Sequence, residues 1–254
     1  MILLHRITPF IIALVIAAGS FLMVRELIQP LLASFLMVSL CAILFARLSR
    51  WNVHQFSFWF FVGTPIIFLS SSFGFLLFLE QDIGRWLLLA LTTILTFLFA
   101  EHIFAYLYAP PIYRPNAIEY LSLVIHLLTI FMMSVVGFGS RLFLQTPIWR
   151  LSTLFFLAAL FIVYSTLWVS KVDAAAAKPY ALCGALLSTE LFAAILFLPS
   201  GMYTSAALIT LFFYLFLGLS RAHVLNRLSV QVLRRYLSIA SIWFFAIILT
   251  AIWV

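Results

Sequence analysis

The stretch RWLLLALTTILTFLFAEHIFAYLY, residues 85–108, decides the fold of this chain. A helix rises about 1.5 Å per residue, so a run of this length crosses the roughly 30 Å hydrocarbon core of a bilayer. Lipid offers no hydrogen-bond partner to an exposed backbone, and a continuous apolar run inside it must therefore be helical. The stretch predicts a transmembrane helix that carries two titratable residues, Glu101 and His102, near its end.

The rest of the chain has the same character. Of its 254 residues, 66% are hydrophobic and 8% are charged, whereas a soluble domain carries about 25% charged residues. Apolar runs alternate with short polar breaks, which predicts an all-α polytopic bundle of about nine helices in one integral-membrane domain over residues 1–254. The predicted spans are 7–28, 30–49, 57–79, 85–108, 117–139, 148–170, 178–198, 201–220 and 236–254.

The basic residues predict the orientation. A net charge of +7 in so apolar a chain fits the positive-inside rule and anionic headgroups better than nucleic acid. The basic residues on the side of the N-terminus are Arg6, Arg47, Arg50, Arg114, Lys171, Lys178, Arg221, Arg227, Arg234 and Arg235, and those on the opposite side are Arg25, Arg85, Arg141 and Arg150. The excess predicts a cytoplasmic N-terminus, an external C-terminus and a place in the cytoplasmic (inner) membrane.

The longest segment between spans, residues 221–235, reads RAHVLNRLSVQVLRR. At 100° per residue its apolar side chains share one side and most basic ones lie opposite, which predicts a short cytoplasmic amphipathic helix on anionic lipid. The predicted lipid contacts are Arg221, Arg227, Arg234 and Arg235. A solvated linker with anchoring arginines is the alternative, and a protein partner at the cytoplasmic face is a further expectation.

The predicted spans 85–108, 117–139 and 178–198 carry glutamates and histidines at overlapping or adjacent depths: Glu101, His102, Glu119, His126 and Glu190. A carboxylate within a span costs about 2.5–3.5 kcal/mol, so Glu101 and Glu190 are expected to face the bundle interior and to find polar partners. Glu119 and His126 are seven residues apart and share a helical face. These residues are the candidates for a binding or proton-relay site, and the alternative is that they hold the helices in register.

Familiar catalytic motifs are absent from the sequence. It contains no GxxxxGK[ST] loop, no GxSxG, no HExxH and no Glu-x-x-His pair. Cys41 and Cys183 lie in apolar runs without CxxC or zinc spacing. We therefore predict no catalytic residue, no cofactor and no metal.

Three classes of function fit these patterns. The first is a small secondary transporter that uses Glu190, Glu101 and His126 as a proton-linked interior site. The second is a non-catalytic membrane scaffold or assembly subunit. The third is a membrane enzyme that acts on a lipid-linked substrate beside Glu119, with Tyr113 and Arg114 as neighbours.

Three segments resemble a known group of proteins. They are PPIYRPNAIEYLSL at 110–123, TPIWRLSTLFFLAALFIVYSTLWV at 146–169 and LFLPSGMYTSAALITLFFYLFLGLSR at 196–221. Together they are similar to a family of uncharacterised multi-pass membrane proteins from candidate-phyla bacteria, a domain of unknown function. The resemblance implies an integral-membrane fold and carries no assigned activity or substrate.

Overall fold

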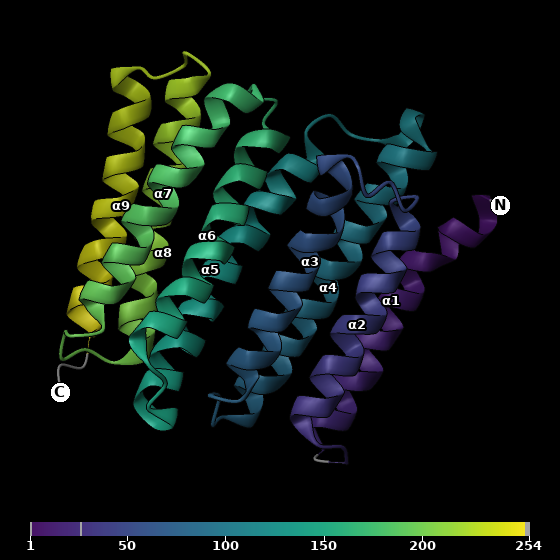
Figure 1. Ribbon diagram of the computed structural model, residues 1–254, viewed down its shortest axis with the longest axis horizontal. Coiled ribbons are helices and arrows are strands. Elements are labelled where there is room, and N and C mark those ends of the chain that lie inside the picture. The colour runs from purple at the N-terminus through teal and green to yellow at the C-terminus, as the bar shows by residue number, and fades with distance from the viewer. Residues whose placement is uncertain (1, 26, 252–254) are drawn as a thin grey trace. The chain divides into compact units, whose positions relative to one another are not determined.

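The computed structural model describes residues 2–25 and 27–251, without the side chains of 2–4 and 112. Over these residues the chain forms nine α-helices and one short 3-10 helix, η1 (Figure 1), which confirms the predicted all-α fold. They are α1 (Ile2–Val24), α2 (Pro30–Leu48), α3 (Phe56–Leu76), α4 (Asp82–Tyr108), η1 (Pro110–Ile112), α5 (Ala117–Leu144), α6 (Ile148–Val169), α7 (Ala174–Ile195), α8 (Met202–Val224) and α9 (Val230–Thr250).

Most of these helices can cross a membrane. In the described part of the chain, eight of them are long and apolar enough to do so. The chain is therefore a multi-pass membrane protein. The helix outside this set is α7, in which Lys178 and Glu190 stand among many small residues.

The chain divides into two compact units. The first, Met1–Ile125, is a bundle in which α1 packs along α4 and α2, and α3 packs along α2 and α4. Its core is aromatic: the ring centre of Phe99 lies 6.0 Å from that of Phe60 and 6.3 Å from that of Phe45. Buried hydroxyls of Ser72 and Thr92 bond to each other and tie α3 to α4.

The second unit, His126–Val254, holds the remainder of α5 and the four helices that follow. Here α6 packs along α7, α7 along α8, and α8 along α9. Phe192 of α7 is buried between two other rings, with its centre 4.6 Å from that of Phe155 and 4.9 Å from that of Phe138. Among the described side chains of α9, Ala240 alone is buried.

The separate amphipathic helix predicted over 221–235 is not present. Residues up to Val224 continue α8, and α9 begins at Val230. Asn226 ends α8 because it adopts a left-handed φ of 53°, a conformation that asparagine tolerates better than most residues. The next amide, Arg227 N–H, bonds back to Ala222 O at 2.8 Å, and Ser229 caps the start of α9.

Candidate functional site

Glu101 of α4 is paired with Arg6 of α1 in the first unit. Arg6 Nη1 lies 3.3 Å from Glu101 Oε2, and the two side chains are 53% and 20% exposed. The Arg6 guanidinium also lies 5.2 Å from the ring centre of Phe104. The carboxylate thus has the polar neighbour that its position demanded. Sequence reasoning did not name this partner because the predicted first span began at residue 7, whereas α1 begins at Ile2.

The ends of α1, α2 and α4 are tied together beside this pair. Tyr108 Oη donates to Leu48 O at 3.0 Å, and Arg50 Nη2 donates to Leu107 O at 3.0 Å. The guanidinium of Arg50 lies 4.7 Å from the ring centre of Tyr108, and the ring of His5 stacks on that of Tyr108 at 4.4 Å. We call this group the polar cap of the first unit: His5, Arg6, Arg50, Glu101 and Tyr108.

The other candidates in the first unit lie near the junction of α4 and α5. His102 is half-buried on α4. Glu119 lies in the first turn of α5 and is buried, a position where the helix dipole favours a carboxylate. The phenol oxygen of Tyr113 accepts a hydrogen bond from Ile118 N–H at 3.4 Å, which holds the preceding loop against the helix start. Arg114 is exposed.

His126 is buried in the second unit, where α5 meets α6. Its Nδ1 lies 2.8 Å from Thr166 Oγ1, and the Thr166 hydroxyl donates to Ile162 O at 2.8 Å. Because a threonine hydroxyl has a single proton, the bond between the two side chains requires a proton on Nδ1 of His126. Ser170 Oγ donates to Thr166 O at 2.9 Å, so the hydrogen bonds continue to the end of α6.

Glu190 lies on the exposed side of α7, contrary to the prediction that it turns into the bundle. Its neighbours two positions away, Ser188 and Phe192, are buried, and two residues correspond to about 200° around a helix. The large ring of Phe192 therefore takes the inward position, and the carboxylate points the other way. Since α7 ends at Ile195, Glu190 lies about 8 Å from that end.

The structure does not gather the predicted residues into one site within either unit. Glu101 belongs to the first unit, and His126 and Glu190 belong to the second. Within the second unit, His126 meets the last turn of α6, while Glu190 is exposed toward the end of the following helix. Among the described residues, no group of three or more His, Cys, Asp or Glu side chains is placed to hold a metal ion.

The polar contacts share one chemistry. In the polar cap and at His126, side chains bond to backbone carbonyls or to side chains of another helix, across sequence separations of 60 residues for Tyr108 and Leu48 and 40 residues for His126 and Thr166. Such bonds satisfy groups that would otherwise stand unpaired in hydrocarbon, and they fix how the helices meet. Glu190 differs from them because its side chain turns away from the packed interior of its own unit.

No protein-family model, curated protein or solved structure matches this chain. The resemblance to an uncharacterised family of multi-pass membrane proteins stays a prediction.

Proposed function

We propose that this multi-pass membrane protein is a non-catalytic subunit of a larger membrane assembly, in the cytoplasmic membrane of a bacterium. The observation that carries the proposal is the exposed carboxylate of Glu190 on α7. A charged side chain within a span costs about 2.5–3.5 kcal/mol when it faces lipid. A partner helix with a basic or hydrogen-bonding side chain at the same depth removes that cost.

The rest of α7 supports the same role. Its exposed side includes Leu182, Leu186 and Glu190, which recur at intervals of four residues and so lie along one stripe of the helix. Lys178 and many small residues make α7 less apolar than the eight helices suited to span a membrane alone. A helix of this composition is better matched to protein than to acyl chains.

The test compares Glu190→Leu and Glu190→Gln with wild type in membranes solubilised in mild detergent. Native gel electrophoresis and light scattering measure the mass of the particle that contains the chain. We expect a larger assembly for wild type and its loss in Glu190→Leu, while circular dichroism shows unchanged helix content. Glu190→Gln keeps hydrogen-bonding capacity and is expected to retain part of the assembly.

The matched control is Glu80→Gln, which removes a carboxylate that is exposed in the loop before α4. It should leave the particle mass unchanged. The proposal fails if wild type has the mass of one chain, or if Glu190→Leu keeps the full assembly. Mixing two differently tagged copies then separates an assembly of this chain with itself from one with another protein.

A proton-linked carrier is the second candidate, and the Arg6–Glu101 pair favours it. This pair joins α1 to α4 with a partly exposed carboxylate, and an ion pair between two helices is broken when the carboxylate takes up a proton. Proton uptake into proteoliposomes, driven by a potassium gradient with valinomycin, tests it without a known substrate. A carrier of this kind loses uptake in Glu101→Gln, whereas an assembly subunit gives no uptake above that of empty vesicles.

A further inference from the structure

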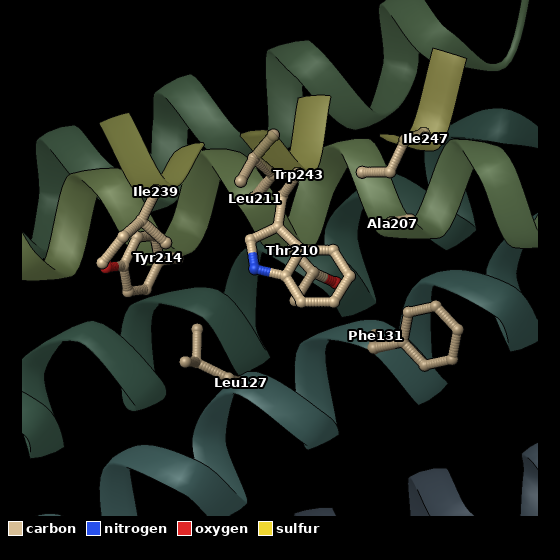
Figure 2. A pocket seen from close by; sticks show the side chains of 9 residues that line it. All are labelled: Leu127, Phe131, Ala207, Thr210, Leu211, Tyr214, Ile239, Trp243 and Ile247. Atoms are coloured by element: carbon tan, nitrogen blue, oxygen red, sulfur yellow. The ribbon is translucent and has the colours of Figure 1, made fainter. Parts of the chain in front are cut away.

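A groove opens in the second unit between α5, α8 and α9. Its volume is about 310 Å³, and its lining is almost entirely apolar. Figure 2 shows Tyr214 and Ile239 at one end, Ala207 and Ile247 toward the other, and the indole of Trp243 between them. The remaining lining residues are Leu127, Phe131, Thr210 and Leu211.

The groove points toward basic residues at one end. Tyr214 lies 5.4 Å, centre to centre, from the ring of Tyr236, and the guanidinium of Arg235 lies 5.4 Å from the centre of that same ring. Arg235 precedes the lining residue Ile239 by four positions, and Arg221 follows Tyr214 by seven. Both spacings keep the arginines on the helix faces that line the groove.

The close approach of α8 to α9 brings the ring of Tyr236 against the backbone of α8. A Cβ atom on Gly218 would lie 2.2 Å from Cε1 of Tyr236, so the ring rests directly on the backbone of α8. This contact sets Tyr236 between the apolar groove and the arginines. Aromatic rings with a polar edge favour this boundary between hydrocarbon and headgroups.

We propose that an anionic phospholipid occupies this groove, with one acyl chain along Tyr214, Trp243 and Ile247. Its phosphate lies at Arg221 and Arg235. The apolar lining excludes a polar solute, and the basic end is complementary to a negative headgroup. The volume of the groove suits a single acyl chain and not an α-helix, which is about 10–12 Å across with its side chains.

The site goes beyond the general attraction of a basic surface for anionic membranes. That attraction depends on charge alone, whereas the groove also requires an acyl chain attached to the headgroup. Removal of charge and filling of the groove therefore have different effects. Removal of the charge abolishes the preference for an anionic over a zwitterionic headgroup. Filling of the groove abolishes binding of the lipid itself.

The experiment is native mass spectrometry of the full chain in detergent, titrated with phosphatidylglycerol or with phosphatidylcholine of the same acyl chains. We expect one phosphatidylglycerol to bind wild type before any phosphatidylcholine does. Arg235→Gln and Arg221→Gln should each weaken that first binding event about fivefold. Ala207→Phe fills the groove and should remove the first binding event for both lipids.

Arg150→Gln is the control for charge, because Arg150 is exposed at the start of α6 and outside the groove. It should leave the first binding event unchanged. Circular dichroism verifies that each variant keeps its helix content. The proposal is overturned if phosphatidylcholine binds as tightly as phosphatidylglycerol, if Ala207→Phe retains the lipid, or if two chains associate in place of lipid.

Discussion

The hydroxyl of Thr166 illustrates how a membrane helix accommodates a buried histidine. It accepts from His126 and donates to the carbonyl of Ile162 one turn earlier. A threonine in a helix often forms this bond to its own backbone, and the remaining lone pairs of the oxygen stay available to another helix. One small residue therefore satisfies an imidazole N–H without any charge in the membrane.

Thr166→Val should destabilise the protein, because it leaves Nδ1–H of His126 without this acceptor. The expected loss is about 1–2 kcal/mol in the free energy of unfolding, measured by unfolding in mixed detergent and SDS. Thr166→Ser keeps the oxygen and should lose less. The control Thr153→Val removes an exposed hydroxyl that makes the same backbone bond on α6. An equal loss in both valine variants would contradict the proposed tie.

The polar contacts of the titratable residues could be predicted only in part from the sequence. The cost of a carboxylate in a span correctly required a polar neighbour for Glu101, and Arg6 supplies it. The same reasoning turned Glu190 inward, although Phe192 competes for the interior from the opposite side of α7. The direction of a side chain depends on which face of its helix packs best, and α7 has apolar residues on every side. Sequence periodicity therefore could not choose between the two faces.

At the scale of elements, helix positions were predicted well and helix ends less well. The nine predicted spans coincide with the cores of the nine α-helices of the described residues, because long apolar runs are a strong signal, although only eight of these helices are apolar enough to cross a membrane. The error lay at 221–235, where an amphipathic pattern was continuous in sequence but broken in structure. Asn226 ends α8 and Ser229 caps the start of α9. These two residues divide the segment into two helices although its amphipathic pattern is continuous.

Close packing at Gly137 of α5 gives a prediction at the same scale. A Cβ added there would lie 2.7 Å from Cζ of Phe192, whose ring is held between Phe138 and Phe155. Since the ring has no free direction, Gly137→Ala should lower the free energy of unfolding by about 1–3 kcal/mol.

Gly84→Ala is the matched control, because its Cβ would meet only side-chain atoms at 3.7 Å or more near the start of α4. Alanine is the better helix former, so this variant should be neutral or more stable by up to about 1 kcal/mol. Thermal unfolding in detergent measures both. If Gly137→Ala unfolds like wild type, then Phe192 is less tightly held than its stacking indicates.

At the scale of the molecule, the distribution of basic residues leads to a prediction of sidedness. The loop before α3 should lie in the cytoplasm, and the loop before α6 should lie outside. With Cys41 and Cys183 replaced by alanine, single cysteines at Asn52 and at Gln145 report the two faces; both positions are exposed. A membrane-impermeant maleimide should label Gln145→Cys in intact cells and label Asn52→Cys only after permeabilisation. The reverse labelling pattern would show that the topology is the opposite of the predicted one.

The separation of Arg6 and Glu101 along the chain has a consequence for biogenesis. The two residues are 95 positions apart, and chains grow at about 5–20 residues per second, so Arg6 is synthesised about 5–20 s before Glu101. During that interval the nascent first segment carries an uncompensated cation at the headgroup level, where anionic lipid can hold it. When α4 enters the membrane, the Glu101 carboxylate replaces the lipid phosphate as the counter-ion of Arg6. The packing of α1 against α4 therefore waits for the synthesis of α4.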